Sequence, residues 1–232
     1  MPLSWIPIPA LVLVLLLLLY FEARAPRYRR AAHALRVIAT LLVAFVAALS
    51  FAQPIHLPLY SALVLVALGW SLVGDWLLIG GASDARRFAR SVVAFAVAHG
   101  FYIAALSYVQ VARGMPLNLG REGGLAAAIG VLALVVYVYL RPRLGESSGV
   151  VAIYVTMLSL MVHRAVSGVD VGASLLSQSV LAGAGAVLFY ISDIMLAINR
   201  FVFNEEGAAN SAWVLSTYYC AQLFLALSAS YL

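Results

Sequence analysis

Long apolar runs separated by short polar linkers are the main pattern along the chain. A helix that crosses a bilayer needs about 20 largely apolar residues, because the hydrocarbon core is roughly 30 Å thick. Backbone groups in lipid must pair internally, and the runs lack the alternation of membrane strands, so they are expected to be helices. The predicted spans are Trp5–Phe21, Ala34–Ala52, Leu59–Gly80, Phe88–Val111, Gly123–Leu140, Gly149–Ser167, Ser174–Phe203 and Ala212–Leu232.

The linkers between these runs hold most of the turn-forming and charged residues. Five of them stand out: Gln53-Pro54, Gly80-Gly81, Gly114-Met115-Pro116, Arg141-Pro142 and Asn204-Glu205-Glu206-Gly207. The seventh run exceeds the thickness of the hydrocarbon and is expected to project from it at one end.

Composition supports a membrane protein. Of the 232 residues, 65% are hydrophobic and 10% are charged, whereas soluble domains carry about 25% charged residues. We therefore predict an all-α bundle of about eight transmembrane helices in one domain over residues 1–232, with no soluble module. Cys220 is the single cysteine, which excludes an intrachain disulfide and a metal site built on cysteine pairs.

The arginines predict an orientation, since the chain has no lysine and positive charge gathers in cytoplasmic loops. Eleven arginines lie around the odd-numbered linkers, and only Arg113, Arg121 and Arg164 lie around the even-numbered ones. We expect the odd linkers in the cytoplasm and both termini outside. The basic cluster after the first span is expected to set this topology and to touch anionic headgroups rather than to bind nucleic acid.

Ionisable and polar residues within the spans are the candidate functional groups, because such groups are costly at membrane depth. Asp75 and Asp193 lie in similar segments near the predicted cytoplasmic ends of spans three and seven, and His99 lies near mid-depth in span four. The other candidates are Tyr102, Tyr154, Thr156, Ser192, Tyr218 and Gln222. Neighbours three or four apart, such as His99 with Tyr102, share a helix face.

The two aspartate segments lie four spans apart, so both helices run in the same direction. His99 follows Asp75 by 24 residues and Tyr218 follows Asp193 by 25, which suggests a parallel duplication of a four-helix unit. We expect both carboxylates in one cavity that opens toward the cytoplasmic leaflet, otherwise lined by aromatic and aliphatic side chains. We expect His163 and Arg164, at the outer end of span six, to be interfacial.

Several of these segments, in order and at similar spacing, resemble the YhhN-like lysoplasmalogenase membrane proteins. The matching segments are Gly74-Asp75, Ala98-His99-Gly100-Phe101-Tyr102, Tyr154 with Val155-Thr156-Met157, Gly185-Ala186 through Phe189-Tyr190-Ile191-Ser192-Asp193, and Tyr218 through Gln222. The resemblance covers most of the chain from span three onward, and the first two spans match poorly.

The resemblance implies an eight-helix fold, hydrolysis of the vinyl ether bond of lysoplasmalogens, and essential roles for Asp75 and Asp193. The chemistry agrees: a vinyl ether opens when an acid protonates its alkene carbon, and paired carboxylates handle similar oxocarbenium ions in glycosidases. No cofactor and no metal is expected, and the partners are a lysophospholipid substrate and membrane lipids. A multi-pass transporter or lipid-binding protein that uses the aspartates for proton or substrate coupling is the alternative.

Environment suggests a role for each aspartate. Ile191 and Ile194 flank Asp193, so desolvation should favour its neutral form and a general-acid role. Asp75 is expected to lie nearer the third-linker arginines, which would favour its charged form. The substrate-binding candidates are His99, Tyr102, Tyr154, Ser192, Tyr218 and Gln222, with Ser192 expected to bond within its own helix.

Overall fold

A computed structural model describes residues 3–24, 28–79, 85–115, 118–170, 173–203 and 211–231. These residues form eight α-helices and no β-strand, so the predicted all-α fold is confirmed. The α-helices are α1 (Ile8–Glu22), α2 (Arg29–Ala48), α3 (Pro58–Ile79), α4 (Ala85–Ala112), α5 (Leu119–Leu144), α6 (Ser148–Ser167), α7 (Gln178–Phe201) and α8 (Ala212–Ser228). Short 3₁₀ turns occupy Leu3–Trp5, Leu49–Ala52 and Gly145–Ser147.

Two helix boundaries differ clearly from the sequence-based expectation. The fifth span was expected to end before Arg141-Pro142, but α5 contains Pro142 and ends at Leu144, followed by a cap at Gly145 with a φ of 52°. The helix can continue through proline by giving up one hydrogen bond, and it stops where glycine allows a positive φ. The seventh helix begins at Gln178 rather than Ser174, because the side chain of Ser177 accepts a hydrogen bond from the Val180 amide and caps it.

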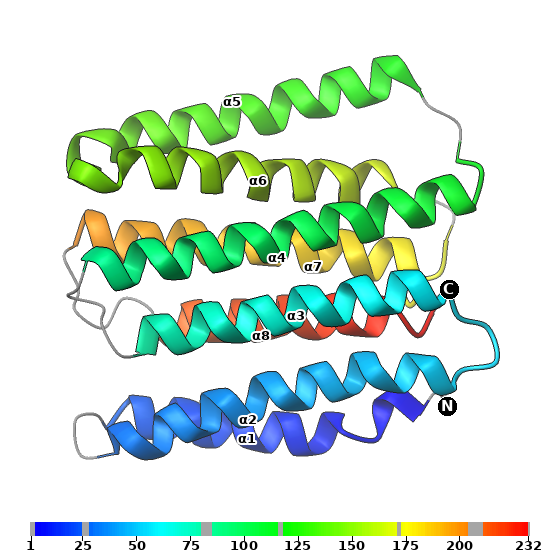
Figure 1. Cartoon of the computed structure of the whole chain (residues 1–232), viewed down its shortest axis with the longest axis horizontal. Coiled ribbons are helices and arrows are strands. Elements are labelled where there is room, and N and C mark those ends of the chain that lie inside the picture. The colour runs from blue at the N-terminus through cyan, green and yellow to red at the C-terminus, as the bar shows by residue number, and fades with distance from the viewer. Residues whose placement is uncertain are drawn as a thin grey trace.

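Six segments of the described chain are long and apolar enough to cross a membrane. One of them, residues 119–167, contains both α5 and α6, which run side by side in opposite directions (Figure 1). Helix α8 has 17 residues and belongs to the shorter apolar helices. The chain is therefore a multi-pass helical membrane protein, and the count of eight spans stays a prediction.

The helices lie roughly parallel, with α5 at one edge and α1 and α2 at the other (Figure 1). The closest pairs are α3 with α4 and α7 with α8, which form the centre of the bundle. Helix α6 packs against α4 and α7, and α2 packs against α3 and α8. Aromatic rings fill the space between the two central pairs, including Phe95 of α4 against Phe189 of α7 and Tyr218 of α8.

Helices α1, α3, α5 and α7 end, and helices α2, α4, α6 and α8 begin, at one end of the bundle, on the left in Figure 1. Both termini lie at the opposite end, where the amide of Gln178 donates a hydrogen bond to the carbonyl of Tyr231. We call the first end the arginine-rich end, since the described arginines there are Arg24, Arg29, Arg30, Arg36, Arg86, Arg87, Arg90, Arg141, Arg143 and Arg200. The linkers at residues 80–84 and 204–210 lie outside the described residues.

Glycines allow the close helix pairs to form. A methyl group on Gly185 of α7 would stand 2.9 Å from Leu225 Cγ and 3.0 Å from the carbonyl oxygen of Ala221, both on α8. A methyl group on Gly74 of α3 would stand 2.7 Å from the ring of Phe95 on α4. Small residues let membrane helices approach closely, and here they set the two pairs that carry the aspartates.

We predict that Gly185→Ala lowers the free energy of unfolding by about 1–3 kcal/mol, because the new methyl group overpacks the α7–α8 contact. Gly130→Ala is the matched control, since nothing lies within 4 Å of a methyl group there. Unfolding of both variants in mixed micelles, followed by circular dichroism, measures the difference. Equal stability of the two variants would contradict the close approach of α7 and α8.

Candidate active site

Asp75 and Asp193 line the same cavity in the centre of the bundle, although they come from different helix pairs. We call this space the aspartate cavity. It is lined by Arg36, Asp75, Leu78, Phe95, Ser192, Asp193, Leu196, Val214, Leu215, Tyr218 and Tyr219. Asp75 is 7% exposed, and Asp193 is partly buried.

Asp75 is held by two donors from neighbouring helices. Its Oδ2 accepts hydrogen bonds from the Tyr218 hydroxyl of α8 at 2.9 Å and from Thr40 Oγ1 of α2 at 3.2 Å. The chain of bonds continues along α8, where Gln222 Nε2 donates to the Tyr218 hydroxyl at 2.9 Å. Tyr102 of α4 donates to Gln222 Oε1 at 3.2 Å, so five buried side chains form one network.

Asp193 belongs to a second network that runs through α6. The Tyr154 hydroxyl donates to Asp193 Oδ2, and His99 Nε2 lies 3.2 Å from the same hydroxyl. His99 is fully buried, its ring packs edge-on against Phe189, and its Nδ1 has no hydrogen-bond partner among the described residues. The second oxygen of Asp193 makes no hydrogen bond to a described residue, which leaves it available for a proton or a bound molecule.

Two of the sequence-based expectations about side chains are wrong. Ser192 was expected to bond within its own helix, but its Oγ donates to the carbonyl of Val214 on α8 at 3.0 Å. It therefore links α7 to α8 beside the aspartate cavity. Thr156 is exposed and donates to the carbonyl of Ala152 in its own helix, so it points away from both aspartates.

A second, mostly apolar cavity adjoins the first. We call it the apolar chamber, and it shares Leu78, Phe95, Asp193 and Leu196 with the aspartate cavity. Its other walls are Phe88, Ser91, Val92, Val136, Leu140, Val151, Tyr154, Val155, Leu158, Tyr190, Ile194, Ala197, Arg200 and Phe201. The chamber contains about 710 Å³ of empty space including its open mouth. Asp193 thus lies where a polar and an apolar space meet.

The arginine beside Asp75 comes from α2, which the sequence-based interpretation missed. Arg86, Arg87 and Arg90 of the third linker region do not line the aspartate cavity, whereas Arg36 does. Arg36 is 4% exposed, and its Nε and one terminal nitrogen donate to Glu22 Oε1 of α1 at 3.1 and 2.9 Å. The signal in the sequence is the spacing of Arg36 and Thr40, which places both on one face of α2.

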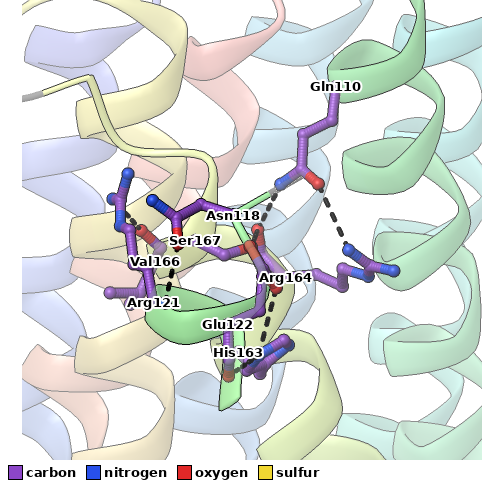
Figure 2. Close-up of polar contacts among 8 residues, drawn as sticks. All are labelled: Gln110, Asn118, Arg121, Glu122, His163, Arg164, Val166 and Ser167. Carbon is purple, nitrogen blue, oxygen red and sulfur yellow. Dashed lines mark hydrogen bonds and ion pairs between the residues drawn. The ribbon is translucent and has the colours of Figure 1, made fainter. Parts of the chain in front are cut away.

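A different polar cluster lies at the end of the bundle that holds the termini (Figures 1 and 2). His163 of α6 and Glu122 of α5 point toward each other, with 3.3 Å between His163 Nε2 and Glu122 Oε2. Gln110 of α4 donates to the carbonyl of Arg164, and Arg121 donates to the carbonyls of Val166 and Val169. These residues join α4, α5 and α6, and none of them lines the aspartate cavity.

The fold and the paired carboxylates define a multi-pass membrane protein with a buried acidic site between two helix pairs. The sequence model of the YhhN family matches residues 32–229. The chain therefore belongs to the YhhN family, which confirms the expected family. The match leaves out the first span, as expected. It includes nearly all of α2, which was expected to match poorly.

Several relatives carry the name lysoplasmalogenase. The chain is 36% identical over 168 residues to "Lysoplasmalogenase TMEM86A" of Bos taurus, which covers 72% of this chain and 64% of that protein. It is 37% identical over 168 residues to the Homo sapiens protein of the same name, with the same coverage. "Lysoplasmalogenase TMEM86B" of Rattus norvegicus is 34% identical over 171 residues, or 73% of this chain and 62% of that protein.

The chain thus spans slightly less than two thirds of the length of these relatives. No solved structure matches the chain.

We predict that Glu22→Ala lowers the free energy of unfolding by about 3–5 kcal/mol, because it removes the carboxylate that binds the buried Arg36 guanidinium. Glu122→Ala is the control, since the Glu122 and His163 side chains are 21% and 15% exposed and such pairs contribute at most about 1 kcal/mol. Denaturation of both variants in the same micelles compares them. A loss at Glu22 no larger than that at Glu122 would show that the Arg36 pair is unimportant.

Proposed function

We propose that this protein is a membrane-embedded hydrolase that cleaves the vinyl ether bond of lysoplasmalogen-like lipids. The products are a fatty aldehyde and a glycerophospho-alcohol. The observation that carries the proposal is the position of Asp193, which shares one cavity with a second carboxylate and borders an apolar chamber. The names of the relatives support the same substrate class.

In this proposal Asp193 is the general acid. Its carboxyl group gives a proton to the alkene carbon that is not bonded to oxygen, and an oxocarbenium ion forms at the other carbon. The donor from Tyr154 occupies Oδ2, so the proton belongs on Oδ1, which makes no hydrogen bond to a described residue. General acid catalysis of this kind contributes about 10²–10⁴-fold to rate.

Asp75 is the second carboxylate in the proposal, and it stays ionised. The bonds from Tyr218 and Thr40 favour the charged form of Asp75, as does the Arg36 cation that lines the same cavity. Asp75 stabilises the oxocarbenium ion and takes one proton from the water that attacks it. The hemiacetal then collapses to the aldehyde and the alcohol, and the proton held by Asp75 replaces the one lost by Asp193.

The remaining site residues position these two groups. Tyr154 and His99 hold Asp193, while Tyr218, Gln222 and Tyr102 hold Asp75. Ser192 fixes α7 against α8. The apolar chamber takes the single hydrocarbon chain of a lysolipid, which places its ether group beside Asp193.

We predict that Asp193→Asn and Asp75→Asn each lower kcat by at least about 100-fold, the low end for general acid–base catalysis. Asparagine keeps the shape of aspartate but can neither supply nor accept the proton. Purified protein in micelles is incubated with lysoplasmalogen, and free aldehyde is measured. Thr156→Val serves as the control, because Thr156 is exposed and bonds only within its helix.

Each outcome separates the possible mechanisms. If Asp75→Asn is inactive while Asp193→Asn has nearly normal turnover, the proposal has assigned the general acid to the wrong residue. Normal turnover in both variants would exclude a carboxylate-pair mechanism. If the wild-type protein releases aldehyde only at the blank rate but moves the lipid or protons across vesicles, the transporter alternative is correct.

We also propose that the protein resides in the cell membrane with its arginine-rich end in the cytoplasm and both termini outside. Positive charge in short loops favours the cytoplasmic side. We predict that reporter fusions at the α1–α2 and α5–α6 connections are active only in the cytoplasm, and that a fusion after Tyr231 is active only outside. A cytoplasmic carboxyl terminus would contradict this orientation.

A further inference from the structure

Arg200 is a charged residue of the apolar chamber that the proposed mechanism leaves unused. It lies in the last turn of α7, and among the described residues it is the only cationic side chain lining that chamber. The remaining walls near it are aromatic and aliphatic, including Phe88 and Phe201. A cation is costly in such surroundings unless it binds an anion or stacks on aromatic rings.

The guanidinium group of Arg200 is held by rings and not by carboxylates. Its central carbon lies 3.9 Å from the centre of the Phe88 ring and 5.7 Å from that of Phe201. These two rings meet edge to face, with 5.6 Å between their centres. The guanidinium makes no hydrogen bond or ion pair with a described residue. Its five N–H donors are therefore open to an anion.

The spacing between Arg200 and Asp193 fits the proposed substrate. They lie seven residues apart on α7, nearly two full turns, so both face the same side and are separated by about 10 Å along the axis. In a lysoplasmalogen, seven bonds join the alkene carbon that takes the proton to the phosphorus atom, and extended they span roughly 9 Å. An ether group beside Asp193 therefore brings the phosphate to Arg200.

The geometry points to Arg200 as the residue that binds the phosphodiester of the lysolipid, about 10 Å along α7 from Asp193. This inference rests on the proposed function. It adds the phosphate as the substrate group whose binding fixes the position of the lipid relative to Asp193. Arginine suits the role, because its planar fork binds two phosphate oxygens at once. Arg36, the cation of the neighbouring cavity, is less suited because two of its nitrogens already bind Glu22.

The test compares two substrates with the same alkenyl chain. One is a lysoplasmalogen with a phosphoethanolamine headgroup, and the other is the 1-alkenylglycerol that lacks phosphate. For Arg200→Gln we expect KM for the phosphorylated lipid to rise at least about 10-fold. Losing a hydrogen bond between charged groups weakens binding by about that factor. We expect kcat to change little, because this binding is equal in the ground and transition states.

The neutral substrate reports whether the variant is folded. Arg200→Gln should cleave 1-alkenylglycerol as fast as the wild-type protein, and Arg200→Lys should recover part of the lost affinity for the phosphorylated lipid. Arg143→Gln is the matched control, because Arg143 is exposed and its guanidinium lies 5.2 Å from the ring centre of Tyr139, outside both cavities. It should leave both substrates unaffected.

Two results would overturn the inference. Equal losses on both substrates would mean that Arg200 supports the structure or the chemistry. An unchanged KM for the phosphorylated lipid in Arg200→Gln would mean that the phosphate binds elsewhere. Failure of the wild-type protein on both substrates would instead reject the proposed function.

Discussion

The structure depends on the cost of keeping carboxyl groups away from water. A polar group buried without a hydrogen-bond partner costs several kcal/mol in an apolar medium. Each aspartate meets this requirement with a tyrosine from another helix, Asp75 with Tyr218 of α8 and Asp193 with Tyr154 of α6. These bonds can form only if α3 lies beside α8 and α6 beside α7. The buried acids therefore fix which helices are neighbours as well as supplying the candidate chemistry.

The two halves of the chain meet this requirement in a related way. Helices α3 and α4 pack as α7 and α8 do, and α2 lies against α3 and α8 as α6 lies against α7 and α4. Tyr218 of α8 reaches Asp75 directly, whereas His99 of α4, at the matching spacing, reaches Asp193 through Tyr154. A parallel duplication stays a prediction, but this arrangement explains how similar segments can produce two unlike carboxyl environments.

That difference is the basis for the two roles proposed for the aspartates. Asp75 accepts two hydrogen bonds and lies beside the Arg36–Glu22 pair, and these neighbours offset part of the cost of a buried charge there. Asp193 has one donor and borders the apolar chamber, so its surroundings suit a neutral acid next to a hydrocarbon chain. Phe95 lies in the wall between the two spaces and packs closely over Gly74. The glycine before Asp75 thus affects the shape of the site through packing.

The sequence by itself determined the helical membrane fold, because apolar run length and the cost of unpaired backbone in lipid leave few alternatives. It also identified both aspartates, since ionisable residues inside apolar runs are conspicuous. It missed the role of Arg36, which looked like one more topology-setting arginine, and it misassigned the partner of Ser192. Only the tertiary structure decided these points. A contact between helices far apart in the chain depends on how their faces pack. The spacing of residues within one helix does not show which other helix that face will contact.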